Sequence, residues 1–271
     1  MASAPQSSRL PVLYKDLVPL SSKEHASWKT RAMNDANFIA NQHAIPLTAE
    51  EFPNAQRDYP IVFSSTEQPV PLALMGLNEG VNVYIDADGK VTDNIYLPAY
   101  IRRYPFMLAR LQPDRDELSL CFDPSAGLVG DFDEGNPLFD GEEPSENTKG
   151  ILGFCEQFER AVQNTSAFVN ELKRLDLLMD GELKIENPNM AKPFLYQGFK
   201  MVNEEKLRDL RGDELRKMSQ SGMLPLLYAH LFSLQGMRDL FARQAAMGKL
   251  PQGTDQPVVP PVVSAGDMQI N

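Results

Sequence analysis

Two consecutive arginines among aromatic residues offer the clearest chemistry in this sequence of 271 residues. Arg102 and Arg103 lie in the segment Tyr96–Phe106, which also contains Tyr100 and Tyr104. Guanidinium groups beside aromatic rings can bind a carboxylate, a phosphate or a planar ligand. Alternatively, the aromatic side chains belong to the core and the arginines pair with acidic residues further along the chain. We favour this alternative, in which the arginines would matter for stability only if partly buried, since exposed ion pairs contribute ~0–1 kcal/mol.

The three histidines, His25, His43 and His230, show no metal-ligand spacing relative to one another or to a cysteine. His230 lies in an apolar, helix-like phrase, where a packed or capping histidine is the ordinary outcome. A histidine, a carboxylate and a nucleophile can still meet in the folded chain, so an enzyme with a site near Arg102, Arg103 and His230 is the second hypothesis. No catalytic residue is assigned. The candidate ligand- or partner-binding residues are Tyr96, Tyr100, Arg102, Arg103, Tyr104 and His230.

Residues 131–146 form the most acidic segment, without any lysine or arginine. Oxygen-rich loops of this kind can bind calcium or magnesium. Counted from Asp131, Glu142 falls at the twelfth position of an EF-hand loop, but Asn136 occupies the sixth position, where glycine is needed. Glycines and prolines in the segment predict an irregular surface loop. We expect a solvated loop, or a surface for a basic partner, and no metal or cofactor site.

The overall charge limits the class of partner. The chain has 37 acidic and 26 basic residues, a net charge of −11 and a pI near 4.8. This balance argues against nucleic acid and anionic membrane surfaces, which require clustered lysine and arginine. No stretch approaches the ~18 apolar residues of a membrane span, and the N-terminus does not resemble a secretory signal. With Cys121 and Cys155 expected as buried thiols in a reducing compartment, we expect a cytoplasmic protein without membrane insertion.

Common enzyme motifs are missing from the sequence. It contains no Gly-X-Gly-X-X-Gly, no P-loop and no Gly-X-Ser-X-Gly pattern. Nucleotide-binding and hydrolase functions therefore lack their usual support, and the sequence favours a protein that is not an enzyme.

Apolar runs in the first half predict an antiparallel sheet. Tyr59–Phe63, Val70–Leu77 and Val81–Ile85 are β-prone, and Asp86–Gly89 supplies a turn after the third run. Short connections between such strands make a meander the economical arrangement.

Helical spacing predicts the elements around this sheet. A helix is expected over Ser21–Asn41, and Thr48-Ala-Glu-Glu51 fits the capping box that starts a helical turn. Ile95–Leu111 has helical spacing that Pro105 interrupts, so a bend or two shorter segments are expected. Apolar positions from Ile151 to Leu175 trace a long amphipathic helix.

Two further strands and three helices complete the pattern. Leu118–Phe122 and Phe194–Val202 are expected as strands, and helices are expected at 204–210, 213–219 and 225–247. The predicted class is α+β, with an antiparallel meander sheet packed with helices and a mainly helical C-terminal half.

The expected domain organisation is simple. Residues 1–10 form a flexible arm, 11–248 a single α+β domain, and the proline-rich residues 249–271 a disordered tail. A subdivision near 130–148 is the alternative.

Several short phrases follow one another along the chain: Tyr59-Pro-Ile-Val-Phe63, Ala73-Leu-Met-Gly-Leu77, Asn82-Val-Tyr84, Tyr96-Leu-Pro-Ala-Tyr-Ile-Arg-Arg-Tyr-Pro-Phe106, Leu138-Phe-Asp-Gly-Glu-Glu-Pro-Ser-Glu146, Gly198-Phe199, Val202-Asn-Glu204, Ser221-Gly222 and Tyr228-Ala-His-Leu-Phe-Ser-Leu234. In this order and spacing they resemble the bacterial SapC family, and the resemblance covers residue 10 to about 245. One departure is Asn203, where an aspartate is expected in the family phrase.

The resemblance implies a role rather than a reaction. The family takes its name from loci for bacterial surface layers, and similar proteins tend to be encoded beside outer-membrane receptors and flavin- or iron-dependent modifying enzymes. It supplies no catalytic residues. We therefore expect a non-catalytic accessory or binding protein tied to surface-layer or outer-membrane processes, with a protein partner of the cell-envelope or modifying-enzyme type.

Overall fold

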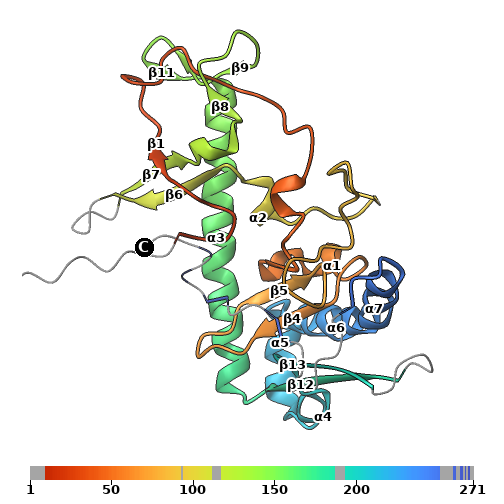
Figure 1. The fold of residues 1–271 in the computed structure, drawn as a ribbon. Coiled ribbons are helices and arrows are strands. Elements are labelled where there is room, and N and C mark those ends of the chain that lie inside the picture. Colours follow the sequence, from red (N-terminus) through yellow and green to blue (C-terminus); the bar gives the residue numbers. More distant parts are fainter. Residues whose placement is uncertain are drawn as a thin grey trace, which may run out of the picture. The chain divides into compact units, whose positions relative to one another are not determined.

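The chain divides into two compact units, neither of which is continuous in sequence. The structure, a computed structural model, describes residues 10–92, 94–111, 117–186, 193–250, 259–260, 263–264, 266 and 268. The first unit comprises Met1–Met33, Arg103–Glu159 and Gly266–Asn271, and the second comprises Asn34–Arg102 and Arg160–Ala265. The long helix α3 (Glu146–Arg174; Figure 1) contributes residues to both. That residues 11–248 fold as a single domain stays a prediction.

The first unit is built on short antiparallel strands. Its sheet has the order β1 (Val18–Pro19), β7 (Leu118–Phe122) and β6 (Phe106–Arg110), and the strand predicted at 118–122 is confirmed. A second small sheet has the order β8 (Val129–Gly130), β2 (Lys29–Thr30) and β9 (Asn136–Pro137). The hairpin of β10 (Phe139–Asp140) and β11 (Glu143–Pro144) and the 3-10 turn η3 (Pro124–Ala126) complete the unit.

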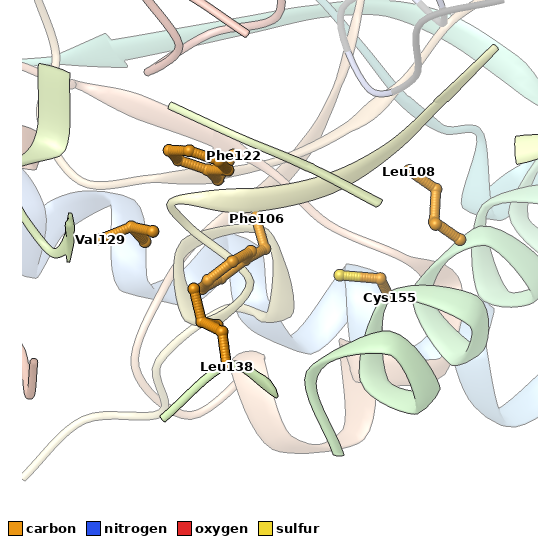
Figure 2. Packing of buried hydrophobic residues seen from close by; sticks show 6 residues of the cluster. All are labelled: Phe106, Leu108, Phe122, Val129, Leu138 and Cys155. Atoms are coloured by element: carbon orange, nitrogen blue, oxygen red, sulfur yellow. The ribbon is translucent and has the colours of Figure 1, made fainter. Parts of the chain in front are cut away.

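The core of the first unit gathers side chains from β6, β7 and α3 (Figure 2). Phe106 and Leu108 are alternate residues of β6 and therefore share one face of the sheet. The rings of His25 and Trp28 pack edge-on against Phe122. The buried cluster consists of Phe106, Leu108, Phe122, Val129, Leu138 and Cys155.

The predicted helix over Ser21–Asn41 is wrong. The segment holds β2 and, further on, only the 3-10 turn η1 (Asn37–Ile39). Lys29 and Thr30 pair on both sides with residues more than 95 positions away. Their backbone groups are thus satisfied by strand pairing, and the helical spacing of the apolar residues is overridden by tertiary contacts.

The second unit contains a five-stranded antiparallel sheet. Its order is β12 (Leu178–Ile185), β13 (Phe194–Val202), β4 (Ile61–Ser64), β5 (Pro71–Leu74) and β3 (Ala44–Pro46). All residues of β3, β4 and β5 are buried, so both faces of this part of the sheet are covered. The α+β class is confirmed, and so are the strands predicted at 59–63, 70–77 and 194–202.

Two other sequence predictions need correction. The third meander strand, Val81–Ile85, is not formed. There the Asn82 side chain accepts the N–H of Tyr84, and Ile85 makes only an isolated bridge with Val91. Within Ile95–Leu111, the interruption at Pro105 is confirmed, but only α2 (Ala99–Arg102) is helical, and the chain continues as strand β6.

The C-terminal half of the chain is mainly helical, as predicted, and its shorter helices follow strand β13. They are α4 (Glu204–Arg208), α5 (Gly212–Gln220), α6 (Met223–Ser233), the 3-10 turn η4 (Leu234–Gly236) and α7 (Met237–Ala246). The single helix predicted over 225–247 is therefore broken. At the break, the hydroxyl of Ser233 donates to the carbonyl of His230 and accepts the N–H of Ile61, which ties the end of α6 to the sheet.

The termini are only partly described. Residues 1–9 of the predicted arm and most of the predicted tail at 249–271 lie outside the described residues. In the described part of the tail, Val263 and Met268 are buried. Val259 lies so close to Gly198 that a Cβ atom added there would be 2.8 Å from the Val259 side chain. Among the described residues, no helix is both long and apolar enough to cross a membrane.

We predict that Leu138→Ala lowers the free energy of unfolding by about 2–5 kcal/mol, because it leaves a cavity in the core of the first unit. Leu138 is fully buried, whereas Leu111 is half exposed and provides the control Leu111→Ala. Urea titration followed by the fluorescence of the single tryptophan, Trp28, measures the difference. Equal effects of the two substitutions would contradict this account of the core.

Candidate functional site

A buried glutamate, Glu51, organises the part of the second unit that contains Tyr96. Glu51 closes the capping box of the 3-10 turn η2 (Ala49–Glu51), which precedes α1 (Phe52–Ala55), as its spacing from Thr48 predicts. One carboxylate oxygen accepts the N–H and the hydroxyl of Thr48, at 2.8 and 2.9 Å. The other accepts the hydroxyl of Tyr96 at 3.0 Å and the N–H of Ala99 at 2.6 Å. Four hydrogen bonds thus satisfy a carboxylate that is 5% exposed.

Tyr96 is fixed at its backbone as well as at its hydroxyl. Its N–H donates to the side chain of Asp58 at 2.8 Å, and its carbonyl accepts the hydroxyl of Tyr59 at 2.8 Å. The Tyr84 hydroxyl donates to the carbonyl of Asp58, and the rings of Tyr59 and Tyr84 meet edge-to-face. Burial, followed by the charge of Glu51, raises the pKa of Tyr96 to about 12, so the phenol remains a hydrogen-bond donor at neutral pH.

Arg102 rests on this network at the protein surface. Its guanidinium donates to the Tyr96 hydroxyl at 3.1 Å and lies 5.6 Å from the centre of the Tyr96 ring. Arg102 is exposed and ends α2, whereas Tyr100, in the same helix, is fully buried. The structure therefore brings Tyr96 and Arg102 together and places Tyr100 in the core.

Arg103 and Tyr104 belong to the first unit, where both are buried. Arg103 is 2% exposed, forms a 3.5 Å ion pair with Glu159 and donates to the carbonyl of Met268 at 2.9 Å. Its guanidinium also lies 4.2 Å from the centre of the Phe158 ring. Tyr104 packs edge-on against Tyr14, and burial raises its pKa to about 12. Arg103 is therefore an interior residue with internal partners.

His230 is fully buried in α6. Its Nε2 atom accepts the N–H of Val202 at 3.1 Å, and its ring lies 5.1 Å from that of Phe63. Burial lowers the pKa of His230 to about 4, so the imidazole is neutral at physiological pH. Within the part of the chain that the structure describes, the contacts of His230 do not include Arg102. The structure thus does not unite these two residues in a common site.

The acidic segment at 131–146 is exposed at every carboxylate. Its irregular loop is interrupted by β9 and by the β10–β11 hairpin, in which Gly141 adopts a φ of 65°. Asp131 accepts the hydroxyl of Ser27, and Glu146 pairs with Lys149. Among the described residues, no group of three or more histidine, cysteine, aspartate or glutamate side chains is arranged to hold a metal ion.

The structure also contains a pocket that the sequence did not reveal. It has a volume of about 530 Å³ in the second unit, within the range usual for small-molecule sites. Its walls come from η2, α3, α5 and α6, segments that are far apart in the chain. Each wall residue has an ordinary place in a local pattern, so no short motif marks the pocket. The lining residues include Ala49, Glu50, Asn164, Phe168, Met218 and Met223.

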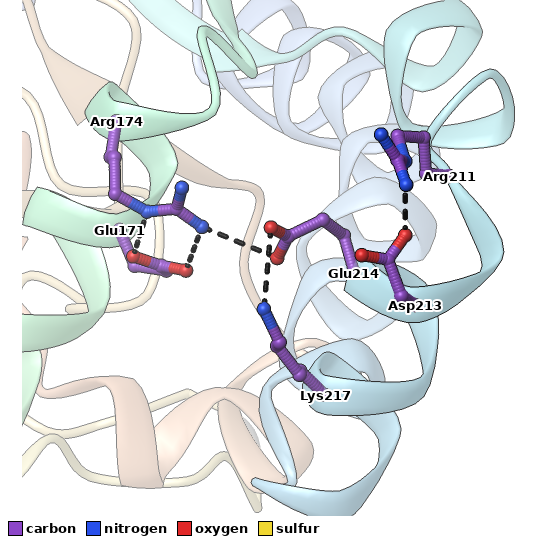
Figure 3. A network of polar contacts seen from close by, with 6 residues as sticks. All are labelled: Glu171, Arg174, Arg211, Asp213, Glu214 and Lys217. Atoms are coloured by element: carbon purple, nitrogen blue, oxygen red, sulfur yellow. Dashed lines mark hydrogen bonds and ion pairs between the residues drawn. The ribbon is translucent and has the colours of Figure 1, made fainter.

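Two residues of the lining, Glu171 and Lys217, belong to a network of paired charges between α3 and α5 (Figure 3). Arg174 donates to both carboxylate oxygens of Glu171 at 2.7 Å and reaches Glu214 at 3.3 Å. Lys217 pairs with Glu214 at 3.5 Å. The hydrogen bonds from Arg174 lower the pKa of Glu171. Arg174 and Lys217 are exposed and Glu171 is partly exposed, so these ion pairs contribute little to stability, but the positive and negative charges compensate one another.

The family comparison gives one clear result. The family model for SapC matches residues 20–240. The chain belongs to the SapC family. No curated protein and no solved structure matches the chain. The span shared with other SapC sequences includes the Glu51–Tyr96–Arg102 network, Arg103, His230 and the pocket, and it ends before the proline-rich tail.

We predict that Glu51→Gln destabilises this SapC protein by about 2 kcal/mol or more, because the amide NH₂ would face donors that need an acceptor. The neighbouring Glu50 is exposed and provides a matched control. Glu50→Gln should change the free energy of unfolding by less than about 0.5 kcal/mol. Chemical denaturation of both variants checks the prediction, and equal small effects would show that the four hydrogen bonds are unimportant.

We predict that His230 makes stability depend on pH between its ordinary pKa of 6.5 and the folded value of about 4. The unfolded chain binds a proton in this range and the folded chain does not, so stability falls as pH is lowered from 6.5 towards 4. The loss is on the order of 3 kcal/mol. His230→Gln should be less stable at neutral pH but should lack this component. Parallel slopes for both proteins in urea titrations across the range would contradict the assignment.

Proposed function

We propose that this SapC-family chain is a non-catalytic binding protein that acts in surface-layer or outer-membrane processes through a protein partner. The observation that carries the proposal is the exposed guanidinium of Arg102, held on Tyr96 by a chain of hydrogen bonds from the buried Glu51. A cytoplasmic location and a partner of the cell-envelope or modifying-enzyme type belong to the same proposal. The location rests on the N-terminal sequence, the absence of a long apolar stretch and the two cysteines expected as thiols, and the partner type rests on the family resemblance.

The geometry around Arg102 suits recognition. An arginine side chain that is already ordered loses less conformational entropy when a partner binds. Its planar guanidinium matches a carboxylate through two parallel hydrogen bonds, which a lysine cannot reproduce. Arg102 therefore fits a carboxylate-bearing protein surface. The exposed acidic segment at 131–146 is a second surface, complementary to basic groups.

The state of the reactive side chains supports a role without catalysis. His230 is neutral, buried and bonded to the backbone of Val202. Burial raises the pKa of Cys121 to about 11 and that of Cys155 to about 12, which keeps both thiols protonated and unreactive at neutral pH. Arg103 has internal partners in its own unit. These groups stabilise the fold where they lie.

We predict that Arg102→Ala weakens partner capture at least about tenfold without unfolding the protein, because it removes charge-assisted hydrogen bonds. The control is Arg208→Ala, which removes another exposed arginine, this one from α4, where it pairs with Glu204. Arg102→Lys keeps the charge but not the planar geometry, and it should weaken binding to an intermediate degree.

The measurement is quantitative affinity capture from cytosolic and envelope fractions of the native host, with thermal unfolding of each variant as a check. The proposal expects one partner of the envelope or modifying-enzyme class, retained by wild type and Arg208→Ala and lost by Arg102→Ala. Equal capture by all variants, or partners unrelated to the envelope, would overturn it.

A further inference from the structure

The pocket of the second unit has a preformed apolar floor. The floor is the lining residue Phe168, whose ring packs against those of Phe52 at 5.9 Å and Phe63 at 6.5 Å. Both partner rings are fully buried, so the floor is anchored in the core. The hydroxyl of Thr165 accepts the N–H of Ala49 at 2.8 Å and thereby fixes η2 to α3, which sets the distance between two of the walls.

A second part of the lining can adapt to the shape of a ligand. Met218 at the end of α5 and Met223 at the start of α6 are buried and line the pocket, together with the partly buried Leu226. Methionine side chains are unbranched and polarizable, and they adjust to apolar groups of different shape. The pocket thus combines a rigid aromatic floor with a flexible aliphatic wall, which suits an apolar body that is not strictly planar.

The charged residues of the lining differ in whether a cation compensates them. The lining residues Glu171 of α3 and Lys217 of α5 belong to a charge network with Arg174 and Glu214, in which two anions pair with two cations and their charges cancel (Figure 3). Glu50 of η2 accepts a hydrogen bond from Asn164 at 2.8 Å and has no cationic partner among the residues that the structure describes. The pocket therefore presents one uncompensated carboxylate beside an apolar interior.

We propose that this pocket binds a small amphipathic amine, with its apolar body on Phe168 and between Met218 and Met223, and its ammonium group at Glu50. A charge-assisted hydrogen bond to a carboxylate is about twice as strong as a neutral one. Asn164 holds Glu50 in place and leaves the second carboxylate oxygen for the ligand. An anionic ligand of the same shape would meet Glu50 without a compensating cation. This site is separate from the Arg102 surface, and it does not depend on the proposed partner.

The test compares three probes that share one alkyl chain and differ in the head group: octylammonium, octanoate and 1-octanol. Methyl NMR of the full-length protein, labelled at methionine, follows each titration at neutral pH. Octylammonium should shift the Met218 and Met223 signals but not that of Met179, which lies on β12 away from the pocket lining. Its dissociation constant should be about tenfold lower than that of octanoate, with 1-octanol between the two.

Two variants separate the charge from the apolar body. Glu50→Gln keeps the acceptor for Asn164 and should raise the dissociation constant of octylammonium to that of 1-octanol. The matched control Glu67→Gln removes an exposed carboxylate of the same unit that does not line the pocket, and it should change nothing. Ala167→Leu adds bulk at an exposed helical position in the lining and should weaken all three probes.

Three results would overturn the proposal. The first is octanoate binding as tightly as octylammonium, and the second is an equal effect of Glu50→Gln and Glu67→Gln. The third is the absence of shifts at Met218 and Met223 on addition of octylammonium. Thermal unfolding of each variant confirms that the fold is intact, so each of these results bears on the site itself.

Discussion

A carboxylate that leaves water must find hydrogen-bond donors for its oxygens, and Glu51 meets this requirement with four donors. Burying a charged group without partners costs several kcal/mol. A conformation in which the donors moved away from Glu51 would therefore be higher in free energy. They come from Thr48, the N-cap of η2, from Tyr96 and from Ala99, the first residue of α2. The Glu51 carboxylate thus fixes its own turn relative to the segment that contains Tyr96 and Ala99, more than 40 residues later in the chain. Arg102 is positioned in turn by its hydrogen bond to the Tyr96 hydroxyl.

Local chemistry made part of this arrangement predictable. The spacing of Thr48 and Glu51 predicted the capping box, because its reciprocal bonds involve residues three positions apart. The strands at 61–64 and 71–74 and the helix α3 were predictable because burial imposes a clear apolar pattern on each. The hydrogen bonds that Glu51 accepts from Tyr96 and Ala99 depend on the tertiary fold, and no local sequence pattern predicts them.

The failed predictions share a physical cause. At Lys29 and Thr30, strand partners from distant segments overrode a helical pattern, and propensity is too weak to resist such pairing. At Ser233, a hydroxyl bonded to the sheet accompanies the break in a helix that periodicity extends to residue 247. The pocket could not be predicted for the same reason, since its walls come from four elements that meet only in the fold.

Two pairs of adjacent residues show where the capacity for binding resides. Glu51 is buried with its oxygens saturated, whereas Glu50, one position earlier in the same turn, is exposed and accepts one hydrogen bond. Arg103 is buried among internal partners, whereas Arg102 is exposed on Tyr96. In both pairs, two neighbouring residues of like charge point into different environments, and the buried one stabilises the fold. The exposed member gains a defined position from its surroundings while its charge still faces solvent, which is the state in which a charged group can recognise a ligand.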